Sequence, residues 1–242
     1  MKTGLVSVTF RRLDCETVVK LCRENNLRFV EWGGDIHVPA GDLQKARAAA
    51  DLCRQSGVIP DGYGSYYNAA DPFETFLPAL EAADALGARY IRIWAGRGKE
   101  YDRSAEERIR TAVRAAEKRG IAVSLECHRD TMTEDPALAL RLAQNTGCLL
   151  HFQPNPDVEF ERNLQTVSDF APYLCAVHVF AWEKGNVRFP LRAQSEQWTA
   201  YANASPDVPF LLEFVCKNDP DNLKDDAETL REIGGGLNEN RA

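Results

Sequence analysis

Four polar residues lie at or near the ends of short apolar runs, and their types could do chemistry together. Glu126 lies near the end of "VSLECH", Glu213 is embedded in "PFLLEFV", His178 lies in "AVHVF" and Gln153 ends "LHFQ". A carboxylate inside such a run is costly to bury unless it is paired or bound to a cation. Two carboxylates, an imidazole and an amide oxygen could ligate one divalent metal ion, and the two carboxylates could also transfer protons.

Other residues near the same run ends could hold a substrate. Arg92 and Trp94, in "YIRIWAG", offer a forked hydrogen-bond donor and an apolar platform. His37, in "GGDIHVPAGD", and His128, which follows Glu126 closely, are weaker candidates because either could be a loop residue without a role. The candidate substrate-binding residues are Glu31, His37, Arg92, Trp94, His128 and Trp182.

These residues need a scaffold that brings strand ends together, and the alternation of patterns along the chain indicates one. Short apolar or β-branched runs predict strands at 4–10, 28–33, 58–63, 88–95, 121–127, 149–153, 175–181 and 209–215. Segments of helical period predict helices at about 13–26, 42–56, 72–86, 104–119, 135–146, 160–173, 194–203 and 221–233. Glycines follow several of these segments, as expected at helix C-termini: Gly57, Gly87, Gly120 and Gly147.

Eight strands that alternate with eight helices over 242 residues predict an α/β protein of the (β/α)8 TIM-barrel type. We expect one compact domain over residues 1–242, because no linker, repeat or low-complexity segment divides the chain. An open doubly wound sheet is the alternative. It would need a glycine-rich phosphate turn after the first strand, and "TFRRLDC" has none.

In a barrel of this type, catalytic groups lie at the carboxyl ends of the strands. We therefore expect Glu126, Gln153, His178 and Glu213 to point into one cavity at that end. Four aromatic residues are expected to supply its apolar walls: Trp32, Trp94, Phe180 and Trp182.

Composition excludes several classes of function. The formal net charge of −7 makes a nucleic acid an unfavourable partner, because phosphate binding needs a basic face. The chain has no apolar run long enough to span a bilayer and no signal-peptide pattern, so we expect no membrane partner and a cytoplasmic location. Its seven cysteines form no CxxC pair, which favours buried thiols in a reducing compartment over a disulfide framework. A nucleophilic Cys127 would have only the neighbouring His128 to activate it.

The chain resembles the sugar isomerase/epimerase superfamily, the xylose isomerase-like barrels, over nearly its whole length. The segments "FVEWGGDIHVP", "IRIWAG", "LECHRDTMTED", "FQPN", "VHVFAW" and "LLEFV" stand where that family has characteristic strand ends. The family's metal, typically Mn²⁺, Mg²⁺ or Co²⁺, is held by Glu, Asp, His and Glu on strands five to eight. The resemblance implies that Glu126, Gln153, His178 and Glu213 hold the metal here.

Gln153 departs from the family pattern, which has Asp at this position. Its neutral amide leaves two carboxylates to balance a divalent cation, so weaker metal binding or a loss of catalysis is expected. The resemblance implies an isomerase or epimerase of a small sugar or sugar derivative, with Mn²⁺ favoured and Mg²⁺, Co²⁺ or Zn²⁺ as alternatives. Glu126 and Glu213 would remove and return a proton α to a carbonyl, through a metal-stabilised enediolate.

Other functions stay open at this stage. Two strand-end carboxylates on a barrel also fit a metal-free glycoside hydrolase, although His178 and Gln153 between them favour a metal. The departure at Gln153 keeps a non-catalytic or divergent sugar-binding barrel open. A zinc endonuclease is disfavoured by the acidic charge and by the small number of histidines. The expected partner is a small sugar or sugar phosphate, and a homodimer is left open. Four basic residues could hold a phosphate: Arg92, Arg97, Lys184 and Arg188.

Overall fold

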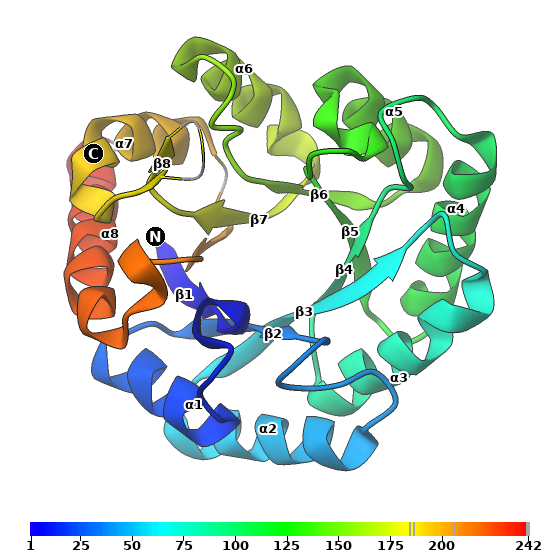
Figure 1. Ribbon diagram of the computed structural model, residues 1–242, viewed down its shortest axis with the longest axis horizontal. Helices are drawn as coiled ribbons and strands as arrows, with labels where there is room; N and C mark the ends of the chain where they lie inside the picture. Colours follow the sequence, from blue (N-terminus) through cyan, green and yellow to red (C-terminus); the bar gives the residue numbers. More distant parts are fainter. Residues whose placement is uncertain (184, 186, 206, 241–242) are drawn as a thin grey trace.

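The protein is a closed barrel of eight parallel strands surrounded by helices (Figure 1). The computed structural model describes the backbone of residues 1–183, 185, 187–205 and 207–240, and the side chains of this set up to residue 235. The order around the barrel is β1-β10-β7-β6-β5-β4-β3-β2, so barrel strands that follow one another along the chain are neighbours in the ring. The predicted (β/α)8 fold is confirmed.

The barrel strands are short, as expected for this fold. They are β1 (Lys2–Val6), β2 (Phe29–Gly33), β3 (Ile59–Asn68), β4 (Tyr90–Trp94), β5 (Ala122–Glu126), β6 (Leu149–Phe152), β7 (Leu174–Val179) and β10 (Pro209–Leu212). A small antiparallel hairpin, β8 (Trp182–Glu183) with β9 (Val187–Arg188), follows β7.

Helices cover the outside of the barrel. They are α1 (Cys15–Glu24), α2 (Leu43–Ser56), α3 (Leu77–Leu86), α4 (Arg103–Glu117), α5 (Pro136–Thr146), α6 (Phe160–Phe170), α7 (Ser195–Ala204) and α8 (Pro220–Asn240). Aspartates accept backbone hydrogen bonds at several N-termini, for example Asp14 from Thr17 and Asp135 from Ala137. Gly57, Gly87 and Gly147 end α2, α3 and α5 in the left-handed conformation that glycine adopts at low cost.

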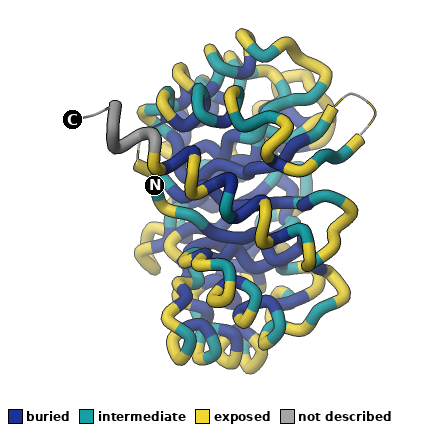
Figure 2. The backbone as a smooth tube through the Cα atoms, turned by 90° about the vertical axis from the view of Figure 1, so that its left-hand side faces the viewer, coloured by how far each residue is buried: buried dark blue, intermediate teal, exposed yellow. Residues whose placement is uncertain are grey.

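The main hydrophobic core lies between the barrel and these helices, while exposed residues lie on the outer rim (Figure 2). Alternation along each strand sends one set of side chains to this core and the other set into the barrel. On β6, Leu150 and Phe152 join the main core, so His151 between them faces inward. The polar residues of the barrel interior are therefore placed by strand register.

Two glycines of β3 make room inside the barrel for large side chains of β4. A Cβ atom on Gly62 would lie 2.1 Å from the ring of Tyr90. A Cβ atom on Gly64 would lie 2.6 Å from the guanidinium of Arg92 and 3.0 Å from Glu31. These glycines allow an arginine and a tyrosine to enter a barrel that is normally filled by smaller apolar side chains.

Candidate functional site

A cavity of about 350 Å³ opens at the carboxyl ends of the barrel strands. Glu126, Gln153 and Glu213 all line it, and these residues end or directly follow β5, β6 and β10. His178 is fully buried and does not line the cavity, but its Nδ1 atom lies 3.3 Å from Oε2 of Glu213. The structure thus brings the four predicted metal ligands to one end of the barrel, with His178 behind Glu213.

Glu126 is held by two donors from β4. Arg92 forms a buried ion pair with Oε2 of Glu126, and the indole Nε1 of Trp94 donates to the same oxygen. Arg92 is only 5% exposed, so this pair is shielded from solvent. The contacts fix the orientation of the Glu126 carboxylate while one of its oxygens has no hydrogen bond from the described residues.

Glu31, from β2, lies beneath the cavity and is shared by several donors. Its Oε1 accepts from Arg92 Nε at 2.9 Å, and its Oε2 accepts from the Tyr90 hydroxyl at 2.8 Å. His151 Nε2 and His178 Nε2 each lie 3.4 Å from Oε2. Burial opposes the charge of Glu31, but Arg92 and then His178 outweigh it and hold the pKa of this carboxyl well below its usual range. Glu31 is therefore a buried anion, and both of its oxygens accept hydrogen bonds.

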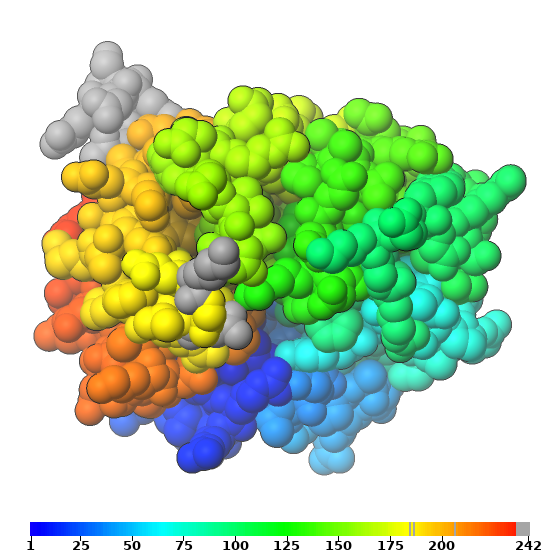
Figure 3. Space-filling model, turned by 45° about the horizontal axis from the view of Figure 1, so that its top comes forward, coloured from blue at the N-terminus to red at the C-terminus, as the bar shows by residue number. Residues whose placement is uncertain are grey.

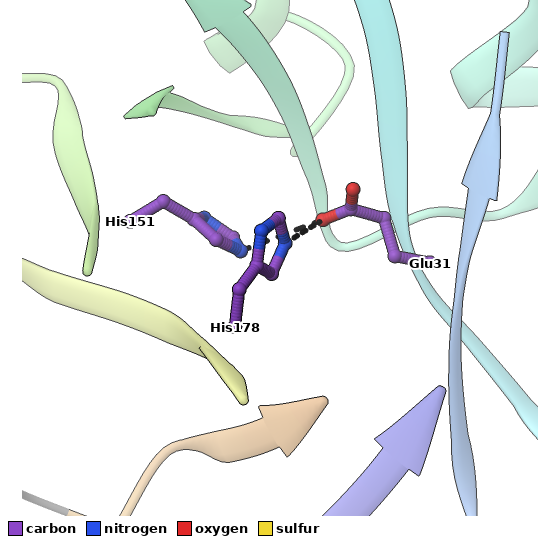
Figure 4. A group of neighbouring side chains, drawn as sticks. All are labelled: Glu31, His151 and His178. Atoms are coloured by element: carbon purple, nitrogen blue, oxygen red, sulfur yellow. Dashed lines mark hydrogen bonds and ion pairs between the residues drawn. The ribbon is translucent and has the colours of Figure 1, made fainter. Parts of the chain in front are cut away.

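Figure 4 shows how Glu31, His151 and His178 meet inside the barrel, coming from three different strands. The two imidazole rings are 4.6 Å apart and form an edge-to-face pair. His151 Nδ1 also lies 2.9 Å from the hydroxyl of Ser124. Burial, followed by the charge of His178, lowers the pKa of His151 well below its usual value. His151 is thus a neutral imidazole that packs against a more basic one.

His178 bridges Glu31 and Glu213 with its two nitrogens. Its Nε2 faces Glu31, whereas its buried Nδ1 lies at ion-pair distance, 3.3 Å, from Oε2 of Glu213 without the geometry of a full hydrogen bond. Burial lowers the pKa of His178, but the charges of Glu213 and Glu31 outweigh burial and raise it to about 10. A positive charge is therefore expected between the Nδ1 atom and the Glu213 oxygen beside it. That charge is either a proton on the imidazole ring or a metal ion bound by both atoms.

The residue types at the cavity floor suit a divalent metal ion, although Glu126, His178 and Glu213 are not among the described groups whose ligand atoms lie within 4.8 Å of one another. Glu126 and Glu213 supply charge, His178 Nδ1 lies 3.3 Å from Glu213, and the Gln153 amide nitrogen donates to the Cys127 carbonyl at 2.9 Å. That bond leaves the amide oxygen of Gln153 as its available ligand atom. Two carboxylates, one amide oxygen and one imidazole suit Mn²⁺ or Mg²⁺ better than a soft metal.

A second group of ligand types is more compact but less suited to a metal. Among the described His, Cys, Asp and Glu residues, Glu31, His151 and His178 are the group with ligand atoms within 4.8 Å of one another. Both oxygens of Glu31 already accept hydrogen bonds from Arg92 and Tyr90. Arg92 also pairs with Glu126, but Glu126 keeps one oxygen without a hydrogen bond from the described residues, whereas Glu31 keeps none. We therefore regard this cluster as support for His178 and Arg92.

The candidate substrate-binding residues divide into two groups. Arg92, Trp94, His128 and Trp182 line the cavity, whereas Glu31 lies beneath it. His37 does not line it. Its Nε2 bonds to the carbonyl of Leu13 at 3.1 Å, and its ring packs against Trp32.

The prediction that Trp32 forms a cavity wall is wrong, whereas Trp94, Phe180 and Trp182 do line the cavity. Trp32 follows Glu31 directly in β2, and adjacent side chains on a strand point to opposite faces. Since Glu31 points into the barrel, Trp32 joins the core between barrel and helices.

Burial raises the pKa of the Cys127 thiol well above its usual value, which disfavours a nucleophilic role for this cysteine.

The predicted phosphate-binding residues do not gather at one place in the part of the chain that the structure describes. Arg92 is engaged by Glu31 and Glu126, and Arg97 pairs with the exposed Asp71. Arg188 lies over the rings of Trp182 and Phe214. Lys184 lies outside the described residues.

Tyr90 and Gly64 are parts of the site that sequence reasoning missed. The alternation of side chains does place His151 on the same face as Gln153, two residues later, but it gives His151 no role. Gly64 carried a signal in "DGYGSYY", because glycine inside a strand often marks a close approach by another group.

No family description matches the chain, and a search of curated proteins finds no match. Solved structures do match it over nearly their full length. The probable 3-DHS dehydratase AsbF from Bacillus anthracis is 17% identical, with a TM-score of 0.78, 96% of this chain covered and 99% of that chain. The D-psicose 3-epimerase from Clostridium cellulolyticum is 14% identical, with a TM-score of 0.69 and coverage of 98% and 99%.

A D-allulose 3-epimerase from Methylomonas is 11% identical, with a TM-score of 0.70 and coverage of 96% and 98%. These similarities show that the chain has the xylose isomerase-like TIM-barrel fold, as the sequence resemblance predicts. Separately, none of the described helices is both long and apolar enough to cross a membrane.

Proposed function

We propose that the protein is a divalent-metal-dependent isomerase or epimerase of a small sugar or sugar derivative. The observation that carries the proposal is that Glu126 and Glu213 line one cavity and that the buried His178 Nδ1 lies 3.3 Å from Oε2 of Glu213. In the barrel order, β7 and β6 separate the strands that carry the two carboxylates. The carboxylates can therefore face a bound substrate from different directions.

The two carboxylates would exchange protons with the carbon next to a substrate carbonyl. One would remove the proton, and the other would return it to the same carbon or help to move it to the next one. Arg92 and Trp94 would hold Glu126 in a fixed orientation, as they do in the structure. A bound divalent ion would act as a Lewis acid that lowers the cost of the charge developing on the carbonyl.

The rest of the cavity suits a small polar molecule with an apolar face. Trp94, Phe180, Trp182 and Phe214 supply aromatic surface, and His128 lies beside Trp94 with ring centroids 5.3 Å apart. A volume of about 350 Å³ is at the small end of ligand cavities. The proposal includes Mn²⁺ as the favoured ion, because the expected ligands are mostly oxygen, and the cytoplasm as the location, consistent with seven free cysteines.

A dehydratase is the second candidate function. The structure of the probable 3-DHS dehydratase AsbF matches this chain with a TM-score of 0.78. Elimination of water from a β-hydroxy carbonyl compound begins with the same proton removal, so Glu126 or Glu213 could start either reaction. The second carboxylate would then protonate the departing hydroxyl group instead of the carbon.

Deuterium exchange tests the proposal. The protein is incubated in D₂O with Mn²⁺ and a panel of ketoses, aldoses, their phosphates and cyclic β-hydroxy carbonyl compounds, and the products are followed by NMR. An isomerase or epimerase should label the carbon α to the carbonyl of its substrate or convert it to an isomer. Formation of an unsaturated or aromatic product would select the dehydratase.

Matched variants identify the proton carriers. Glu126→Gln and Glu213→Gln should each reduce labelling and turnover by at least about a hundredfold, because each removes a proton carrier. Glu134→Gln, which changes an ion-paired cavity carboxylate outside the predicted ligand set, is the control and should retain activity. No labelling and no conversion across the panel, with metal bound, would favour a non-catalytic sugar-binding barrel. Hydrolysis of a test glycoside after metal chelation would favour the glycoside hydrolase.

A further inference from the structure

A second cavity, of about 310 Å³, adjoins the first at the same end of the barrel. The two cavities share the loop after β6 and the segment after β7. Their common lining residues are Pro154, Asn155, Pro156, Val158, Asn163, Phe180 and Trp182. Figure 3 shows these two segments side by side on the surface, in lime green and yellow. A ligand that passes Phe180 and Trp182 would therefore occupy both cavities.

The polar groups of the second cavity are mostly neutral. The described residues that line it include no Lys, Arg or His, and Glu183 is their one charged side chain. The first cavity, in contrast, is lined by Arg92, Arg129 and Arg162. A phosphate or carboxylate group would thus find no cationic partner among the described lining of the second cavity.

Several of these neutral groups have hydrogen-bonding capacity to spare. Tyr201 is 4% exposed, and its hydroxyl makes no hydrogen bond with the described residues. Burial raises the pKa of Tyr201 to about 12, so the phenol remains protonated and can both donate and accept. The Gln197 amide likewise has no side-chain partner there, and Gln194 uses only its Nε2, which donates to the Trp182 carbonyl at 3.0 Å.

Aromatic rings lie beside these groups. Phe160 and Tyr201 have ring centroids 5.5 Å apart, and Phe180 and Trp182 have centroids 4.7 Å apart. Hydroxyl groups of a neutral ligand can bond to amides and phenols, while its C–H surface packs on aromatic rings. Trp182 contributes to both cavities, so it can contact the ligand on either side.

We propose that the second cavity is a subsite for a neutral, hydroxyl-bearing extension of the substrate, such as a second sugar ring. This inference rests on the proposed function for the identity of the reacting end, which would occupy the first cavity beside Glu126 and Glu213. The substrate would then be a glycosylated or otherwise extended sugar. A single small ketose would fill the first cavity alone.

Calorimetric titration of the Mn²⁺-loaded protein tests the subsite with defined probes. The probes are glucose, fructose, galactose and the disaccharides maltose, cellobiose, lactose and sucrose. At least one disaccharide should bind about tenfold more tightly than each of its component sugars, since it gains contacts in both cavities. Disaccharides that bind no more tightly than their components, or show no binding at all, would overturn the subsite.

Two variants locate that gain in affinity. Tyr201→Phe and Gln197→Ala should each weaken binding of the selected disaccharide about fivefold to tenfold, because each removes hydrogen-bonding groups from the second cavity only. Their affinity for the component sugars should not change. Gln165→Ala, on α6, is the control, because its amide bonds to exposed Asp169 and it lines neither cavity. An equal loss for disaccharide and component sugars would overturn the assignment.

The test of the subsite can fail or succeed independently of the test of the proposed function. The deuterium exchange experiment is repeated with the selected disaccharide. Binding that depends on Tyr201 without deuterium labelling or turnover would retain the subsite and count against the proton-transfer function. Labelling of a single ketose without any preference for disaccharides would retain the function and remove the subsite.

Discussion

At the scale of single residues, Glu31 connects the two carboxylates that we propose as proton carriers. It bonds to Arg92, which holds Glu126, and it lies beside His178, which faces Glu213. A fully buried carboxylate is stable only with such partners. One residue beneath the cavity therefore influences the orientation and charge of both sides of the candidate site.

The first prediction concerns this buried network. Glu31→Gln should destabilise the protein by about 3 kcal/mol, because it removes one of the two anions that balance buried Arg92. Urea unfolding followed by circular dichroism measures the effect. The double variant Glu31→Gln/Arg92→Met should lose further stability, since buried Glu126 then has no cationic partner in Arg92.

An exposed ion pair provides the matched control. Asp71→Asn breaks the pair with Arg97 at the surface and should leave the unfolding transition almost unchanged. Wild-type stability of Glu31→Gln would contradict the view that Arg92 depends on this carboxylate.

The second prediction concerns Gln153. Gln153→Asp should bind Mn²⁺ more tightly, by about tenfold, because a third carboxylate strengthens attraction to a cation in a partly buried site. Titration calorimetry of the metal-free protein measures this affinity. Gln165→Asp adds the same charge on α6, away from the cavity, and should have little effect. Unchanged or weaker binding by Gln153→Asp would mean that this side chain does not face the ion.

At the scale of elements, β3 contributes to the site through its glycines, because the absence of a side chain at Gly64 leaves room for Arg92. Gly64→Ala should destabilise the protein by about 1–3 kcal/mol and displace Arg92, because the new Cβ would lie 2.6 Å from its guanidinium. Urea unfolding and a crystal structure of the variant measure both effects. Gly235→Ala in α8 is the control: a methyl group there would have no neighbouring atom within 4 Å, and alanine favours a helix. Equal stability of both variants would show that β3 can shift without cost.

A buried aspartate in α8 predicts a pH dependence of stability. Asp226 accepts a hydrogen bond from the backbone nitrogen of Leu191 at 2.7 Å, in the short 3-10 helix η5 (Leu191–Gln194). Burial raises the pKa of Asp226 to about 6, above its ordinary value of 3.8. The folded protein therefore holds this proton more tightly than the unfolded chain. As the pH rises from about 4 to about 6, this residue reduces the free energy of unfolding.

Replacement of Asp226 should remove that dependence. Asp226→Asn keeps an oxygen that can accept from Leu191, so at pH 8 it should be more stable than the wild type by about 1–3 kcal/mol. At pH 4 the two proteins should differ little. Thermal unfolding at both pH values, with exposed Glu81→Gln in α3 as the control, measures the difference. A loss of stability at pH 8 would mean that the charge of Asp226 is needed.

The elements were largely predictable because periodicity and helix-ending glycines are local signals. The ends of the strands were less predictable from the sequence, because contacts with side chains of other strands determine where a strand ends. The first strand, expected at 4–10, ends at Val6, and the 3-10 helix η1 (Ser7–Phe10) follows. There the hydroxyl of Thr9 accepts from the backbone of Phe214, in the segment after the neighbouring β10. The last strand, expected at 209–215, ends at Leu212, since Phe214 adopts a φ of 50°.

At the scale of the whole molecule, the closed barrel explains why strand-end residues could be predicted to converge. Glu126, Gln153 and Glu213 come from separate strands, and barrel closure alone brings them to one cavity. The network beneath them was not predictable in detail. It depends on register between strands, such as the pairing of Glu126 with His151, and on the space left by Gly64. Those relations belong to the assembled barrel and leave little trace in any one segment.

The last prediction concerns the stability of the whole barrel with and without metal. If Glu126, Gln153, His178 and Glu213 hold a divalent ion, binding stabilises the folded state because the unfolded chain has no assembled site. Metal at about one hundred times its dissociation constant adds about 2.7 kcal/mol, which for a protein of this size raises Tm by about 5 °C or more. Differential scanning fluorimetry of chelator-treated protein with Mn²⁺, Mg²⁺, Co²⁺ or Zn²⁺ measures the shift, and elemental analysis should find about one ion per chain. Glu213→Gln should lose most of the shift, whereas Glu183→Gln, on the hairpin beside the second cavity, should keep it. Absence of any shift and of bound metal in the wild type would mean that His178 Nδ1 is held to Glu213 by a proton on the ring, and the candidate site would then operate without a metal ion.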